Sequence, residues 1–78
     1  MLRTRLRREV SNYFFDNGDL TMDLQIVVEG LVFTTGIPLH GDHYEAPDGT
    51  HVWTILDHIV VYRIEENWLT VEVVMPVI

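Results

Sequence analysis

The sequence contains no cysteine and no lysine, and it has no hydrophobic run long enough to cross a bilayer. The absence of cysteine excludes disulfides, thiol nucleophiles and every metal site that needs a cysteine ligand. A transmembrane helix is not expected, because such a helix needs about 18 consecutive apolar residues. The N-terminus is basic but lacks an uninterrupted apolar segment and a small-residue cleavage site. We therefore expect no secretory signal and predict a cytoplasmic protein that does not bind membranes.

Residue patterns of known catalytic sites are also missing. Ser11 is the only serine, and no phosphate-binding loop, dinucleotide-binding glycine motif, nucleophile elbow or HExxH motif occurs. Paired carboxylates, such as Asp42 with Glu45 or Asp57 with Glu72, would need a cleft that shifts a carboxyl pKa. A chain of 78 residues leaves little room for such a cleft. The sequence therefore predicts a protein that is not an enzyme.

The chain is short but rich in apolar residues. Its 78 residues are 47% hydrophobic, which predicts one folded domain over residues 1–78. A small domain can bury only a limited fraction of its apolar surface, so another chain is expected to cover part of it. We expect a homodimer or an obligate partner, and the alternative is a tightly packed monomer with ordinary apolar exposure.

The charge is strongly negative and unevenly distributed. Twelve acidic residues oppose five arginines, for a net charge of −7. Four of the arginines lie in the first eight residues: Arg3, Arg5, Arg7 and Arg8. From Glu9 onward twelve acids face Arg63 alone, a net charge of −11. Such a body disfavours direct binding of nucleic acid and favours a basic protein surface, although carboxylates can also serve only to keep a domain soluble.

We divide the chain into a basic arm, residues 1–10, and an acidic body, residues 11–78. Leu2, Leu6 and Val10 are four residues apart, which predicts a short helix in the arm. The arm could contact RNA, an anionic membrane or the acidic body of a second copy. The last possibility pairs the basic arm of one copy with the acidic body of another, so we assign self-association to the four arginines of the arm.

The first part of the body is expected to be a hairpin. Asn17–Gly18 is a preferred pair for a type I′ turn, and we favour this turn over a helix that continues to Phe15. Apolar and polar side chains alternate over residues 19–29, which predicts a strand with one buried face. A further strand is expected over residues 31–35. In this arrangement Phe15 faces the core and Phe14 lies on the wet face.

The second part of the body is expected to contain two further hairpins. The segment Ala46–Thr50 is typical of a tight turn between a strand near Tyr44 and a strand that begins at Thr50. Residues 50–60 also fit a helix, but their β-branched side chains favour a strand. A closing hairpin with its turn at Glu66–Asn67 would place Ile64 opposite Leu69, Tyr62 opposite Val71 and Val60 opposite Val73.

The sequence thus predicts a mainly β, small α+β fold. It would be an antiparallel meander or small rolled sheet of five to six strands with a short N-terminal helix.

One segment of the chain resembles a known family. Residues 59–64, followed by residues 68–74, look like the closing hairpin of RelE/ParE-type toxins and cover about a fifth of the chain. Those toxins are typically basic and carry two helices before the sheet. This chain is acidic and its sequence predicts neither helix, so we make no family assignment from the hairpin.

The four histidines are the candidate metal ligands: His40, His43, His51 and His58. Imidazole and carboxylate groups are preferred by zinc, iron and nickel where sulfur is missing. On one continuous strand His51 and His58 would point to opposite faces, because they are seven residues apart. A shared site would require a helix there, so we rate these ligands as weak and predict no metal or cofactor.

The leading functional hypothesis concerns surface charge. Asp19, Asp23 and Glu29 would share one face of the expected strand, where alternate residues lie about 6.5–7 Å apart, close to the phosphate spacing of a nucleic-acid strand. With Phe14 and Trp68 as apolar anchors, they would occupy a basic surface of a nucleic-acid-handling protein.

In size and charge the chain is similar to small phage-encoded antagonists of host defence, which implies an inhibitor. The alternatives are an accessory or structural subunit that binds through an apolar sheet face, and a small histidine-based metal-binding domain.

Overall fold

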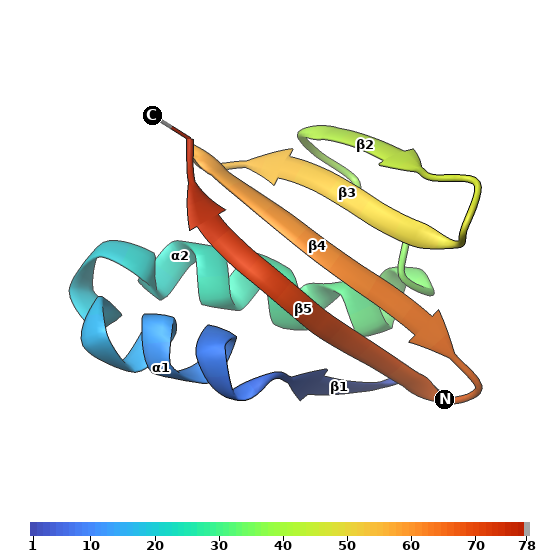
Figure 1. The fold of residues 1–78 in the computed structure, drawn as a ribbon, viewed down its shortest axis with the longest axis horizontal. Coiled ribbons are helices and arrows are strands. Elements are labelled where there is room, and N and C mark those ends of the chain that lie inside the picture. Colours follow the sequence, from blue (N-terminus) through green and yellow to red (C-terminus); the bar gives the residue numbers. More distant parts are fainter. Residues whose placement is uncertain (78) are drawn as a thin grey trace.

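A five-stranded sheet with helices against one face makes up the computed structural model, which describes residues 1–77 (Figure 1). The elements follow one another as β1 (Arg3–Leu6), α1 (Arg8–Asp16), α2 (Gly18–Glu29), the 3-10 helix η1 (Gly30–Thr34), β2 (Asp42–Glu45), β3 (Thr50–Ile55), β4 (His58–Glu65) and β5 (Trp68–Pro76). The predicted class, a small α+β fold with a mostly antiparallel sheet, is confirmed. No helix within the described chain is long and apolar enough to cross a membrane.

The sheet has the strand order β1-β5-β4-β3-β2. Strands β2 to β5 form the expected antiparallel meander, but β1 joins the far edge and runs parallel to β5. The predicted helix over residues 2–10 is therefore wrong for Arg3–Leu6. The Arg3 amide donates to the Asn67 carbonyl at 2.8 Å, and the Arg7 amide donates to the Val71 carbonyl at 3.1 Å. This pairing with the end of the chain overrides the local helical spacing.

The segment expected to be the first hairpin is a pair of helices. Asn17 lies at their junction, where its side-chain amide donates to the Tyr13 carbonyl at 2.9 Å. The Asn17 carbonyl accepts the amides of Leu20 and Thr21, which begins α2. The Asn17–Gly18 pair therefore turns one helix into the next instead of closing a hairpin.

Helix α2 occupies the residues predicted as the clearest strand. Its buried side chains, Thr21, Leu24 and Val28, are spaced by three and four residues, and Leu31 of η1 continues this stripe. Apolar residues occur on every side of this segment. Packing of one side against the sheet therefore gives the buried residues the spacing of a helix. The strand expected over residues 31–35 is likewise replaced by η1.

The hairpins of the second half are close to prediction. The turn at Ala46–Thr50 joins β2 to β3, and residues 50–60 are extended apart from a two-residue turn at Leu56–Asp57. Ile64 pairs with Leu69 and Tyr62 with Val71, as expected. Further along, a register shift between Val61 and Tyr62 pairs Val60 with Val74, so the expected Val60–Val73 pair is wrong.

The core lies between the helices and the sheet face that they cover (Figure 1). Its buried apolar side chains come from both layers: Val10, Phe14, Leu24, Val28, Leu31, Trp53, Val60, Tyr62, Leu69, Val71 and Val74. The Tyr62 hydroxyl donates to the Gly36 carbonyl at 2.6 Å. Phe14 is 6% exposed and Phe15 is 87% exposed, which reverses their expected roles. In α1, Phe14 lies four residues after Val10 and shares its buried face.

Candidate protein-interaction surface

The acidic residues singled out by the sequence lie on the outward side of α2. Asp19 and Asp23 are four residues apart and therefore share a face of the helix, about 6 Å apart along its axis. Glu29, in the last turn, lies on the flank of that face. The strand row expected for these three residues is thus wrong, because their spacing is helical. All three are exposed, and no salt bridge among residues 1–77 involves them.

Large apolar side chains are exposed on the same side of α2. Met22 is 59% exposed and Ile26 is 63% exposed, and these two residues are four apart. Ile26 also lies three residues after Asp23 and three before Glu29, so the apolar and acidic side chains are interleaved. A helix that is apolar all round is usually covered on both sides. We refer to these five residues (Asp19, Met22, Asp23, Ile26 and Glu29) as the α2 surface.

A cavity of about 180 Å³ lies beside the α2 surface. Its walls come from α2, η1, β3 and the segment between η1 and β2, and include Val27, Leu31, Trp53 and Ile55. Leu39 also lines the cavity and stays 77% exposed. Sequence reasoning missed this cavity, because its walls meet only when residues 18–29 form a helix.

The predicted anchor Phe14 is not available to a partner, because it is buried in the core. Trp68 is half-buried at the start of β5, and the arginines of β1 cover its ring. The Arg5 guanidinium lies 4.6 Å from the ring centroid and that of Arg3 lies 5.8 Å away. Trp68 therefore belongs to a basic surface at the β1 edge and lies outside the acidic one.

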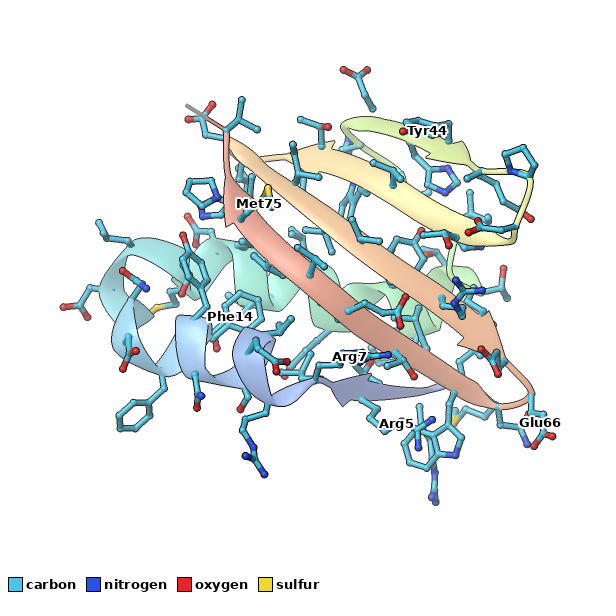
Figure 2. All side chains as sticks on the ribbon, viewed as in Figure 1. Arg5, Arg7, Phe14, Tyr44, Glu66 and Met75 are labelled. Carbon is cyan, nitrogen blue, oxygen red and sulfur yellow. The ribbon has the colours of Figure 1, made fainter. Side chains whose placement is uncertain are left out.

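The basic arm pairs with its own chain in this structure. Arg7 forms a 2.8 Å salt bridge with Glu72, and Arg5 donates to the Thr70 hydroxyl at 3.3 Å. Figure 2 shows Arg5 and Arg7 at the edge of the sheet formed by β1. The assignment of Arg3, Arg5, Arg7 and Arg8 to self-association stays a prediction. If it holds, the arm must contact a second copy from its place at the edge of the sheet.

Three acidic residues of the sheet region lie within 4 Å of Arg63, whereas Asp42 and Glu45 of β2, like the acidic residues of α2, are in no salt bridge among residues 1–77. Arg63 lies 3.6 Å from Glu72 and 3.9 Å from Asp48, and it donates to the Thr50 hydroxyl at 2.8 Å. Hydrogen bonds from Thr50, and then the charge of Arg63, hold the pKa of the Asp48 carboxyl below its usual range. Carboxylates outside these salt bridges therefore lie on both layers, on α1 and α2 and on β2, within a stretch that has no arginine or lysine between Arg8 and Arg63.

Two of the four histidines come together. His43 Nε2 and His51 Nδ1 are 2.9 Å apart, and the two rings are stacked. His51 also stacks on Tyr62, with ring centroids 4.8 Å apart, and burial lowers the pKa of its imidazole. His58 instead lies 2.8 Å from the Tyr13 hydroxyl, and the His40 carbonyl accepts the indole N–H of Trp53 at 2.7 Å.

The expectation that His51 and His58 face opposite sides of the sheet is wrong. The turn at Leu56–Asp57 pairs Ile55 with His58, so both histidines lie on the helix-facing side, at different ends of the hairpin. No group of three or more metal-ligating side chains could hold an ion in the part of the chain that the structure describes.

Comparisons with protein-family models, with curated proteins and with solved structures find no match to this chain. Two helices lie between β1 and the other four strands, whereas the RelE/ParE-type toxins that the closing hairpin resembles carry two helices before the sheet. The charge remains opposite to the basic character of those toxins. Function must therefore be argued from the surfaces themselves.

Proposed function

We propose that this chain is a non-enzymatic binding protein that inhibits a nucleic-acid-handling partner by occupying its basic surface. The α2 surface supplies the contact in this proposal. The observation that carries it is the interleaving of unpaired, exposed carboxylates with exposed Met22 and Ile26 on one side of a helix. Carboxylates steer the encounter with a basic groove, and the apolar side chains supply area that becomes buried on contact.

The test is a triple charge reversal on α2, Asp19→Lys with Asp23→Lys and Glu29→Lys. Each reversal adds two charge units, so the net charge changes from −7 to −1. We expect binding to the partner to weaken at least about a hundredfold and inhibition to be lost. The partner is first captured from host extract at low salt and identified by mass spectrometry, and its affinity is then measured against salt concentration.

A matched control places the same charge change on the sheet. The exposed residues Asp42, Glu65 and Glu66 are converted to lysine, which again gives a net charge of −1. This variant should lose only the long-range part of the attraction and retain most of the binding. An α2 reversal that binds and inhibits like the parent would end the proposal, as would an affinity that hardly changes between low and high salt.

A second candidate function is that of an accessory subunit that binds through the open face of the sheet. Helices cover one face only (Figure 1). On the other face Val52, Val61 and Val73 are neighbours across three adjacent strands. Binding through this face would be insensitive to salt, which separates it from the first proposal. If a second copy covers it, a solution mass measurement at micromolar concentration gives a dimer. A monomeric mass would exclude both a homodimer through this face and the self-association assigned to the arm.

A further inference from the structure

The cavity beside α2 is lined almost entirely by apolar groups. Val27 and Leu31 form one side of it, and Trp53 and Ile55 of β3 form the other. The indole N–H of Trp53 already donates to the His40 carbonyl at 2.7 Å. Among residues 1–77 no buried side-chain nitrogen or oxygen lacks a hydrogen-bond partner. The cavity therefore suits an apolar group better than a nucleotide or a sugar, which would need several polar partners within it.

The volume of the cavity limits the size of its occupant. An apolar cavity of about 150 Å³ is known to accept one benzene ring, whereas sites for cofactors and drug-sized ligands measure about 300–1,000 Å³. A cavity of about 180 Å³ thus accepts one aromatic ring or one leucine side chain.

The rim of the cavity indicates that the occupant belongs to a larger molecule. Leu39 lines the cavity and is 77% exposed. A small free ligand would leave most of this side chain in water. A side chain carried on a polypeptide would fill the cavity while its backbone and neighbours cover the rim, as at the anchor residues of protein interfaces.

Charge defines the chemistry of that polypeptide. Between Arg8 and Arg63 the sequence contains nine acidic residues and neither arginine nor lysine. Strand β1, with its arginines, is separated from β3 by β5 and β4, so it lies at the other side of the sheet from the cavity. Basic residues that flank the anchor would therefore be attracted to this side of the molecule.

We infer that the cavity is the anchor site for one phenylalanine or leucine side chain of a basic polypeptide partner. This inference rests on the proposed function and adds to it the identity of the apolar contact. The anchor enters between α2 and β3, while basic residues next to it contact the carboxylates of the α2 surface.

Gly30 provides a direct way to close the cavity. It lines the cavity, has helical backbone angles (φ −65, ψ −17), and a Cβ added to it would meet no atom within 4 Å. Gly30→Leu therefore adds a bulky apolar side chain at the wall of the cavity with no clash at its Cβ. Gly18→Ala is the matched control, because Gly18 lies at the other end of α2, also has space for a Cβ, and does not line the cavity.

The probes are two capped pentapeptides with two lysines on each side of a central phenylalanine or a central alanine. Methyl groups of Val27, Leu31 and Ile55 report binding by NMR. We expect the phenylalanine peptide to bind the wild-type chain at least about tenfold more tightly than the alanine peptide, because one aromatic side chain is buried. The ratio of the two affinities should be unchanged in Gly18→Ala and should fall to nearly one in Gly30→Leu.

Two results would overturn the inference. One is an equal affinity of the wild-type chain for the two peptides. The other is a capped phenylalanine without lysines that binds as tightly as the pentapeptide, which would indicate a small-molecule site. The α2 triple reversal separates this inference from the proposed function. The triple reversal should weaken the binding of both pentapeptides by the same factor. The ratio of their two affinities should stay unchanged, so the anchor site and the charge contact can fail independently.

Discussion

The stability of this protein should fall in mildly acidic solution because of a single buried histidine. His51 is 6% exposed, between His43 and the ring of Tyr62, and burial lowers the pKa of its imidazole from the usual 6.5. The unfolded chain therefore takes up a proton at this residue more readily than the folded chain does. Neighbouring charges act in both directions, since Glu45 raises this pKa and His43 lowers it, but desolvation is the largest cause.

The size of the effect follows from proton linkage. Because the folded-state pKa is lowered, the stabilisation is fully present above about pH 6.5 and is lost as the pH falls toward the folded-state value. One proton taken up on unfolding gives a limiting slope of about 1.4 kcal/mol per pH unit. The hydrogen bond between His43 and His51 adds a structural reason, because one of the two nitrogens must be without a proton to accept it. The Asp48 carboxyl, whose pKa lies below its usual 3.8, titrates outside this range.

Urea unfolding followed by circular dichroism, at about pH 7.5 and about pH 5.5, measures the effect. The wild-type chain should lose up to about 1.4 kcal/mol between these two conditions. His51→Phe keeps a flat ring against Tyr62 and should remove most of this dependence. His40→Gln is the control, because His40 is exposed and hydrogen-bonds to Trp53 through its backbone carbonyl. The same pH dependence in His51→Phe and in the wild-type chain would refute the reasoning.

Two core substitutions test the assignments made for single side chains. Phe14→Ala should destabilise the fold by about 3–5 kcal/mol in urea unfolding, whereas Phe15→Ala should change stability by less than about 0.5 kcal/mol. Equal effects would contradict the orientation of α1. Tyr62→Phe should cost about 1–3 kcal/mol, because the buried Gly36 carbonyl loses its hydrogen-bond donor. Burial raises the pKa of Tyr62 to about 12, so this cost should be the same at neutral and mildly alkaline pH, and a cost that vanishes above neutrality would argue against the bond.

The second half of the fold could be predicted from the sequence because its turns are encoded locally. Pro47 and Gly49 define one turn and Glu66–Asn67 another, and each turn sets the register of the strands that it joins. What could not be predicted there was the register shift at Val61/Tyr62, because a bulge leaves no clear pattern in a run of valines.

The first half could not be predicted because its sequence fits two periods. Leu20, Met22, Leu24, Ile26 and Val28 alternate as in a strand, yet in the structure only Leu24 and Val28 are buried. A segment with apolar residues on every side shows no single period, so tertiary packing decides its conformation. Predicting a strand in place of α2 also affected the candidate site. The carboxylates are exposed as expected, but their arrangement depends on α2, and the burial of Phe14 depends on α1.

Strand β1 was missed for a different physical reason. It pairs with β5 across almost the whole chain length, Arg3 with Trp68 and Leu6 with Val71. Parallel pairing between distant segments has no turn to signal it. The clustering of arginines in the arm was evident from sequence, but its partners on the sheet, such as Glu72, could be found only in the folded chain.

The placement of charge on α2 supports the proposal that a partner recognises its carboxylates. Asp19 and Asp23 repel each other at a spacing of four residues, at a cost of about 0.2–0.5 kcal/mol. Glu29 lies at the C-terminal end of the helix, where the dipole favours cations, and the last turn holds no basic residue. Asp19, in the first turn, is favoured by the same dipole, but a helix selected for solubility alone could use lysine at Asp23 and Glu29 and gain stability. A local arrangement that opposes helix stability without a compensating contact is characteristic of a functional surface.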